Sequence, residues 1–259
     1  MAKSRDILKQ GFSTTYRVVI CPKERIIELL PLMIERAGFE IGEYKLVLVK
    51  PNLCGMYYPD TRLIEEVLRI FEPYARKIII GETNSMMHTP ERQFRRFGIY
   101  DLIKKFGEKV EALNLMKDEI LSLDVPSPHV IKRLPIPKLV NECDLLINIP
   151  KVGTHSNTKL TCALKNLFGL LAESNKYGVY HRLGVDKVIA DLVKIVKCDL
   201  NVVDVGEKVM VGVDPLAIDI VACSFVGLDP LKVEHLRLVS EDRNLKLEEI
   251  MRRLQVIEM

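Results

Sequence analysis

Four side chains suited to chemistry gather near the middle of the sequence, namely Lys151, His155, Lys165 and Asn166. Ammonium, imidazole and amide groups suit a site that holds a small anion and moves protons. Lys165 is the most informative of the four because its neighbours are apolar. Burying an unpaired ammonium is costly or lowers its pKa, so Lys165 either extends to solvent or belongs to a site.

Two predicted elements flank these side chains. An apolar strand is expected at 144–149 and should end at Pro150, which lacks a backbone donor. After a polar loop, Thr161 is expected to cap a helix over 161–171 that is apolar on nearly every face. The four side chains then lie at a strand end or in the helix beyond it, where ligands bind in open α/β sheets.

The rest of the chain alternates between apolar strands and amphipathic helices. Strands are expected at 16–20, 45–50, 77–80 and 200–204, with a shorter extended piece at 209–213, and helices at 22–37, 60–76, 185–197 and 214–225. The strand, helix and strand between 45 and 80 form a βαβ unit, which requires parallel strands. We therefore expect an α/β fold with a mainly parallel sheet, helices on both faces and a functional rim at the carboxyl ends of the strands.

The whole chain, 1–259, is expected to form a single α/β domain. A proline-rich stretch predicts turns and an extended connector over 118–140, which would also allow a two-lobed organisation. The charged segment 231–259 is expected to be helical, to pack at the edge and to carry no chemistry. Asp191 is expected on the solvated face of its helix.

Polar residues follow four of the predicted strands, at 50–52, 81–84, 151–155 and 204–207. The carboxyl ends of parallel strands meet at one edge, so these residues should converge on one rim. The side chains expected to hold a small anion there are Lys50, Asn52, Lys151 and Asn166.

Three carboxylates, those of Glu82, Asp214 and Asp219, would orient these groups or hold a divalent cation. Asp214 is also the natural cap of the helix that begins at Pro215. Asp219 lies in an otherwise apolar helix and needs a partner, for which Lys165 is a candidate.

Two of the five histidines are candidates for proton transfer. His155 follows a predicted strand, and His181 lies in a loop that can return to the same rim. His88, in the loop after the strand at 77–80, has a comparable location, whereas His129 and His235 are expected at the surface. Lys165 would act beside the histidines as an electrostatic clamp or a covalent attachment point.

Composition limits the classes of partner. The 38 basic and 35 acidic residues give a net charge of +3, which is too balanced for a protein built to bind nucleic acid. No run approaches the roughly 20 apolar residues needed to span a bilayer. Residues 1–10 lead into no apolar targeting segment, so we expect a cytoplasmic protein without membrane contact.

The six cysteines stand singly, with no C-x-x-C pair, so the sequence carries no iron–sulfur or zinc motif. Four of them, Cys143, Cys162, Cys198 and Cys223, are expected as small buried hydrophobes. The glycine-rich fingerprints of nucleotide cofactors, G-x-G-x-x-G and G-x-x-x-x-G-K-[ST], are also absent. The cofactor is unknown, with a divalent metal or a group tethered to a lysine as alternatives.

Several longer motifs resemble the domain of unknown function 362 family. They are Val49-Lys50-Pro51-Asn52-Leu53, Gly81-Glu82, Asn148-Ile149-Pro150-Lys151 with Thr154-His155, Ala163-Leu164-Lys165-Asn166-Leu167-Phe168-Gly169, His181, and Gly212-Val213-Asp214-Pro215-Leu216-Ala217-Ile218-Asp219. The resemblance implies a protein of unsettled activity. Many relatives carry an added ferredoxin-like iron–sulfur segment, which this chain lacks, so electron transfer would need a separate ferredoxin-like partner.

A weaker resemblance, in spacing alone, is to the nickel-pincer lactate racemase family. His155, Lys165 and His181 match a histidine, a lysine ten residues on and a later histidine, and His88 stands near the place of a further one. The resemblance implies that the lysine tethers the pincer cofactor, with histidines as metal ligand and acid/base groups.

These observations favour an enzyme that binds a small anionic substrate or cofactor, a carboxylate or phosphate, and performs acid/base chemistry of a racemase, epimerase or oxidoreductase kind. The alternative is a non-catalytic protein that binds a cofactor or serves a redox partner. A third interpretation makes the lysines and carboxylates a buried ion network, which is costly unless well paired. A homo-oligomer is compatible with each of these interpretations.

Overall fold

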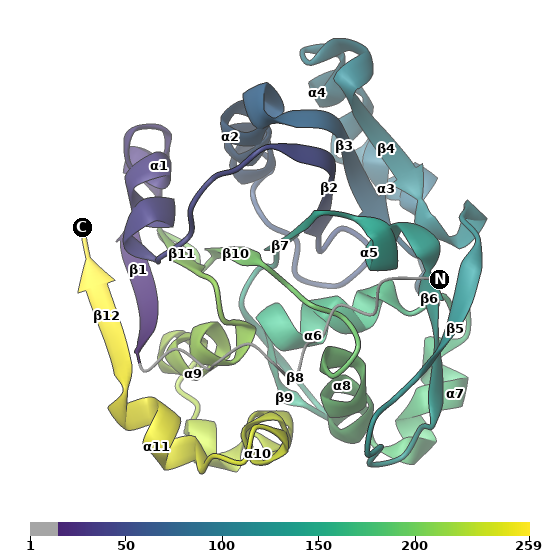
Figure 1. Ribbon diagram of the computed structural model, residues 1–259, viewed down its shortest axis with the longest axis vertical. Coiled ribbons are helices and arrows are strands. Elements are labelled where there is room, and N and C mark those ends of the chain that lie inside the picture. The colour runs from purple at the N-terminus through teal and green to yellow at the C-terminus, as the bar shows by residue number, and fades with distance from the viewer. Residues whose placement is uncertain (1–14) are drawn as a thin grey trace.

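The computed structural model describes residues 15–259 and is organised around an eight-stranded sheet with the order β12-β1-β11-β10-β7-β2-β3-β4 (Figure 1). The strands are β1 (Tyr16–Pro22), β2 (Tyr44–Pro51), β3 (Ala75–Glu82), β4 (Val110–Asn114), β7 (Leu145–Ile149), β10 (Leu200–Asp204), β11 (Lys208–Gly212) and β12 (Leu254–Glu258). Strand β11 runs antiparallel to both of its neighbours, and the other pairings are parallel. The predicted α/β class and mainly parallel sheet are confirmed.

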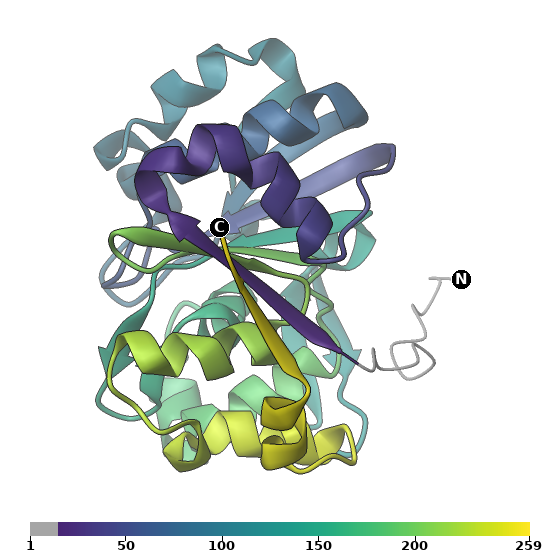
Figure 2. The same ribbon diagram turned by 90° about the vertical axis from the view of Figure 1, so that its left-hand side faces the viewer.

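Helices cover both faces of the sheet (Figure 2). One face carries α1 (Ile26–Arg36), α2 (Thr61–Phe71), α3 (Pro90–Arg96) and α4 (Ile99–Lys104). The other carries α5 (Lys138–Glu142), α6 (Ala163–Leu167), α7 (Lys176–Tyr180), α8 (Val185–Val193), α9 (Pro215–Phe225), α10 (Glu234–Asp242) and α11 (Leu247–Arg252). Alternate residues of a strand face opposite sides, so Val47 and Val49 of β2 enter one core and Leu48 the other.

The proline-rich stretch contains more structure than its sequence predicts. Strands β5 (Ile120–Asp124) and β6 (Arg133–Pro137) form a separate antiparallel pair, and α5 follows directly. The expectation of a connector without elements is therefore wrong. Pro135 and Pro137 are tolerated within β6 because, in the described part of the chain, this strand pairs with β5 alone, and an edge strand does not need every backbone donor.

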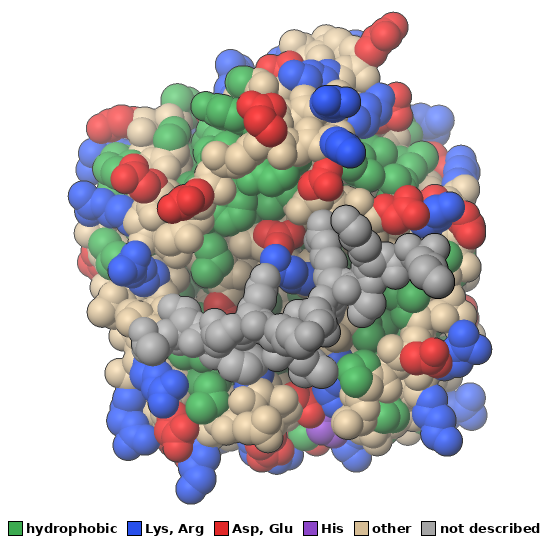
Figure 3. Space-filling model, in the orientation of Figure 1, with side chains coloured by type: hydrophobic (Ala, Val, Ile, Leu, Met, Phe, Trp, Pro, Cys, Tyr) green, Lys and Arg blue, Asp and Glu red, His purple; other side chains and the backbone are tan. Residues whose placement is uncertain are grey.

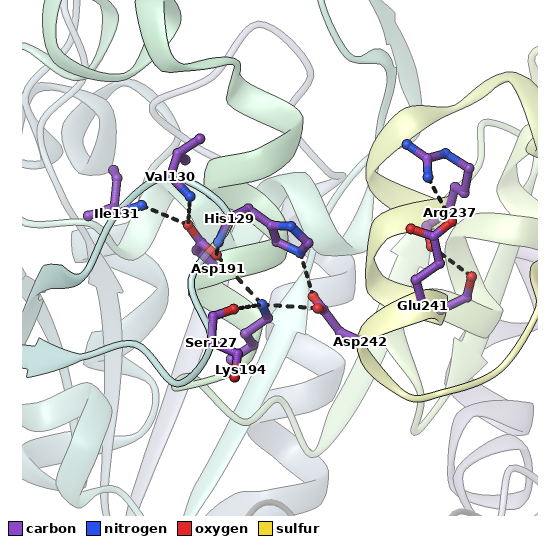
Figure 4. A network of polar contacts seen from close by, with 10 residues as sticks. Ser127, His129, Val130, Ile131, Asp191, Lys194, Arg237, Glu241 and Asp242 are labelled. Carbon is purple, nitrogen blue, oxygen red and sulfur yellow. Dashed lines mark hydrogen bonds and ion pairs between the residues drawn. The ribbon is translucent and has the colours of Figure 1, made fainter.

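Asp191 fastens the loop between β5 and β6 to α8 (Figure 4). Its fully buried carboxylate accepts hydrogen bonds from the backbone N–H groups of His129, Val130 and Ile131 at 2.7, 2.9 and 3.0 Å. Lys194 contacts the same carboxylate at 3.7 Å and donates to the Ser127 carbonyl at 2.8 Å. The predicted solvated position of Asp191 is wrong, because three backbone donors compensate for its burial.

The C-terminal segment also departs from expectation. Its helices α10 and α11 confirm the expected helical character over most of the segment, but they are followed by β12, which pairs with β1 at the edge of the sheet. The edge placement is thus confirmed, whereas the last residues form a strand instead of a helix. His235 of α10 is fully buried, and its Nδ1 lies 2.6 Å from Oδ1 of Asp186. The predicted surface position of His235 is wrong because an acidic partner on α8 makes its burial tolerable.

The surface agrees with the balanced charge of the sequence, since acidic and basic side chains are interspersed over the face shown in Figure 3. Within residues 15–259, none of the helices combines the length and apolar character needed to cross a membrane. The expectation about residues 1–10 lies outside the described part of the chain.

Candidate functional site

A row of polar side chains crosses the sheet in register. Asn148 of β7 pairs with Lys50 of β2 on one side and with Asn201 of β10 on the other, and Asn201 pairs with Gly212 of β11. Asn148 Nδ2 donates to Asn201 Oδ1 at 2.9 Å, and Asn201 Nδ2 donates to the Gly212 carbonyl at 3.2 Å. These buried amides satisfy one another and give the candidate site a rigid base.

Lys50 occupies the end of this row and is almost fully buried. Its Nζ lies 3.0 Å from Glu82 Oε2 and donates to Asn166 Oδ1 at 3.0 Å and to the Pro51 carbonyl at 2.6 Å. Glu82 in turn accepts from the Leu53 N–H at 2.7 Å. All three ammonium donors of Lys50 therefore have protein partners, so Lys50 serves here to hold Glu82 and Asn166 in place.

Helix α6 begins two residues later than predicted, at Ala163, and its N-terminus is capped by Asp219 instead of Thr161. Asp219 Oδ1 accepts from the Ala163 N–H at 2.6 Å, and Oδ2 accepts from the Leu164 N–H at 3.0 Å. Thr161 is instead part of the short strand β9 (Lys159–Thr161). The partner of the Asp219 carboxylate is thus the helix backbone and not Lys165, and burial raises the pKa of Asp219 to about 6.

A cavity of about 250 Å³ opens beside this base. It brings together seven of the predicted site residues, Lys50, Asn52, Glu82, His155, Lys165, Asn166 and His181. They come from the ends of β2 and β3, from the hairpin strand β8 (Gly153–His155), from α6, and from the 3-10 helix His181–Leu183. The convergence follows from the parallel order β7-β2-β3, which places the carboxyl ends of these strands on one rim.

The other four predicted site residues do not line this cavity. Lys151 lies 4.0 Å from Asp204 Oδ2, in a cluster where Lys23 approaches the same carboxylate at 2.7 Å. Asp214 caps α9 through the Leu216 N–H and pairs with Arg243 at 2.6 Å.

Asp219 is enclosed beneath α6, and the loop of His88 folds on itself through a backbone bond from Ser85 N–H to the His88 carbonyl at 2.9 Å. All four of these side chains were expected at the rim because of their position after a strand or in an apolar helix. Position after a strand brings a residue to the rim but does not fix the direction of its side chain.

Lys165 and the two histidines line the cavity together, and the pKa of each is shifted. The rings of His155 and His181 have centroids 6.5 Å apart, and the Lys165 Nζ lies 5.3 Å from the Phe168 ring centroid. Burial lowers the pKa of Lys165 to about 8, against a smaller opposing effect of Asp186. Burial and the Lys165 charge lower the pKa of His155 to about 4, and the same two causes lower the pKa of His181.

Lys176 and Tyr177 are cavity residues that the sequence analysis missed. Lys176 Nζ donates to Thr83 Oγ1 at 2.8 Å and to the Asn84 carbonyl at 2.5 Å, and burial lowers its pKa to about 8. Tyr177 packs on His181 with ring centroids 4.0 Å apart. Both stand in a polar segment that resembles an ordinary surface loop in sequence, so no local signal could have identified them.

The side chains of the site offer nitrogen donors and few carboxylates. Within residues 15–259, no group of three or more His, Cys, Asp or Glu side chains is placed to hold a metal ion. Cys54 also lines the cavity, and burial raises the pKa of its thiol, so it stays protonated. A metal held by the two histidines would therefore need further ligands from outside this set of side chains.

Comparison with solved structures finds a similar fold in a larger protein. The lactate racemase apoprotein from Thermoanaerobacterium thermosaccharolyticum aligns with 80% of this chain and 56% of its own, at 17% identity and a TM-score of 0.52. A protein from Thermotoga maritima aligns with 70% of this chain and 50% of its own, at 12% identity and a TM-score of 0.44. The chain thus spans about half the length of these structures, and the first likeness shows the fold alone.

The sequence gives a family assignment although the search of curated proteins finds no match. Residues 47–207, more than half of the chain, match the family described as a domain of unknown function (DUF362). The matched segment contains most of β2 and all of β3, β7 and α6, and with them most of the cavity wall. This chain therefore belongs to the domain of unknown function 362 family.

Proposed function

We propose that this chain is an enzyme that binds a small carboxylate or phosphate in the cavity and carries out acid/base chemistry on it. The observation that carries the proposal is the convergence of His155, His181 and Lys165 on one cavity wall, from three separate elements. Titratable groups with shifted pKa values in a cleft are typical of functional sites.

The environment of the Lys165 ammonium supports the proposal that the ligand is an anion. It is largely enclosed, and it has no carboxylate or carbonyl acceptor among residues 15–259. Lys50 differs because its three donors are occupied. A desolvated ammonium that contacts no acceptor is unfavourable, and an anion bound beside it would supply the direct contact that Asp186, which acts on Lys165 only through its charge, does not. Lys176 adds a second positive charge on the same cavity.

The imidazoles of His155 and His181 support the proposal that the site transfers protons. With pKa values lowered by burial, both rings are neutral at pH 7 and can accept or share a proton. A bound anion would favour the protonated rings and raise their pKa values toward neutrality. The likeness in fold to a lactate racemase favours a small carboxylate substrate and a racemase or epimerase reaction, ahead of an oxidoreductase reaction.

A tethered cofactor is compatible with the same residues. The Lys165 amine, with a pKa of about 8, is the attachment point that the cavity offers, and His155 and His181 are the nitrogen donors beside it. Such a group would supply redox chemistry that side chains lack. Mass spectrometry of the intact protein would reveal an adduct, which Lys165→Met should abolish.

The test of the proposed function is an exchange assay in deuterium oxide. Small 2-hydroxy and 2-amino carboxylates, with D- and L-lactate first, are incubated with the protein; NMR follows deuterium at the α-carbon and chiral chromatography follows racemisation. We expect turnover of at least one compound by the wild type and its loss in His181→Ala. The matched control is His129→Ala, which removes a histidine outside the cavity.

The non-catalytic alternative predicts a different result. A protein that only binds or carries a cofactor would bind a member of the panel, seen as a rise in melting temperature, and would turn over none of them. Absence of both binding and turnover across carboxylates and inorganic phosphate would overturn the anion site itself.

A further inference from the structure

One ring nitrogen of His155 is already engaged by the backbone. His155 ends β8 and is joined to β9 by a tight turn, so that His155 pairs with Lys159. The backbone N–H groups of Asn157 and Thr158 both donate to His155 Nδ1, at 3.2 and 3.3 Å. Two donors from consecutive residues thus point at a single nitrogen.

A nitrogen that accepts hydrogen bonds carries no proton, so the neutral ring must carry its proton on Nε2. Adding a proton to Nδ1 would set it against the two backbone donors of Asn157 and Thr158. The turn therefore opposes protonation of the ring, in the same direction as burial and the positive charge of Lys165. His155 lines the cavity, and Nε2 is the ring nitrogen left for a ligand.

We propose that the turn at 156–158 locks His155 as the Nε2–H tautomer, which makes His155 a fixed hydrogen-bond donor to a ligand oxygen and leaves the proton-accepting role to His181. This assignment rests on the proposed function and gives His155 and His181 different roles in it. The ring of His181 has no hydrogen-bond partner among residues 15–259 and contacts Tyr177, so either of its nitrogens is available.

The locked tautomer narrows the class of substrate. A neutral N–H donor and the Lys165 ammonium on one wall together favour an oxygen that carries or develops negative charge. A carboxylate whose α-proton is removed meets this description, because charge moves onto its oxygens as the carbon–hydrogen bond breaks and His181 takes the proton. No co-reactant is needed for that step, since the proton returns to carbon from the protonated His181 or from water.

A simpler interpretation is that the imidazole only caps the turn, as asparagine side chains do in many loops. Two variants separate the interpretations. His155→Asn keeps an acceptor near the Nδ1 position and can cap the turn, but has no donor at the Nε2 position. His155→Gln has an amide N–H near the Nε2 position. A capping role alone predicts that ligand binding survives in His155→Asn.

The decisive experiment is long-range proton–nitrogen NMR on the full chain labelled with nitrogen-15 histidine, with His155→Asn identifying the His155 signals. From pH 6 to 8 we expect an unprotonated Nδ1 and a protonated Nε2 for His155, while His181 averages between tautomers or titrates. A His155 ring protonated at Nδ1, or averaging between both nitrogens, would overturn the proposal. This readout needs no substrate, so it is independent of whether turnover is found.

Inorganic phosphate and L-lactate then probe the donor role. We expect binding to shift the His155 Nε2–H resonance and to weaken about tenfold in His155→Asn, with partial recovery in His155→Gln, as for loss of one hydrogen bond to a charged acceptor. Equal binding by His155→Asn and the wild type would contradict the donor role. Failure of both probes to bind the wild type would count against the proposed function. The NMR measurement would still decide whether the turn at 156–158 fixes the Nε2–H tautomer of His155.

Discussion

Lys50 and Asn166 hold each other through two reciprocal hydrogen bonds. Lys50 Nζ donates to Asn166 Oδ1 at 3.0 Å, and Asn166 Nδ2 donates back to the Lys50 carbonyl at 3.2 Å. The same amide nitrogen donates to Asn148 Oδ1 at 2.7 Å. Asn166 thus joins α6 to β2 and β7, and it sets the position of Lys165, its neighbour in the helix.

Removing this link should loosen the site and the fold together. Asn166→Ala leaves Asn148 Oδ1 and one Lys50 donor without partners, so we expect a loss of about 2–3 kcal/mol in the free energy of unfolding. Urea denaturation measures it. Asn157→Ala is the matched control, because within residues 15–259 that exposed side chain bonds only to neighbouring Ser156, and it should change stability by less than about 0.5 kcal/mol.

The buried pair of Lys50 and Glu82 should show strong coupling. Lys50→Met leaves the Glu82 carboxylate buried with the Leu53 N–H as its remaining partner, so we expect a loss of about 3–5 kcal/mol. In Lys50→Met/Glu82→Gln no buried charge is left unpaired, and the loss should be well below the sum of the single losses. Additive losses in this double-mutant cycle would show that the two groups act independently.

The loop between β5 and β6 should depend on Asp191. Asp191→Ala removes the acceptor of three backbone N–H groups, and we expect a loss of about 3 kcal/mol with increased proteolysis at 127–131. Glu241→Ala serves as the control, since it removes an exposed ion pair with Arg237 in the same region and should cost less than about 1 kcal/mol (Figure 4). Unchanged proteolysis in Asp191→Ala would show that Asp191 does not hold this loop against α8.

Anion binding should weaken as pH rises through about 8. Burial lowers the pKa values of Lys165 and Lys176 to about 8, so both are ammonium groups at pH 6–7 and lose their charge above pH 8. Calorimetric titration with L-lactate, a full anion over this range, should show affinity falling from pH 7 to 9.5. Affinity independent of pH in this window would mean that neither lysine provides the binding charge.

The sequence predicted the rim well and individual side-chain directions poorly. Pro51 and Pro150 mark the ends of two predicted strands and so located the edge where the cavity lies, because the positions of the strands and the parallel direction of a βαβ unit follow from local patterns. The cap of α6 could not be predicted, since it joins Asp219 to Ala163 across 56 positions of the chain. Lys176 was missed for the same reason, because its environment depends on contacts with Thr83 and Asn84.

The central claim is that Lys165 provides the positive charge for a small anion in the cavity. Its most direct test is calorimetric titration of the wild type and Lys165→Met at pH 7 with L-lactate and with inorganic phosphate, after urea denaturation has shown both proteins to be folded. We predict one-to-one binding of at least one anion by the wild type and a loss of affinity of about tenfold or more in Lys165→Met. Binding of equal affinity by the two proteins, or no binding by the wild type, would contradict the claim.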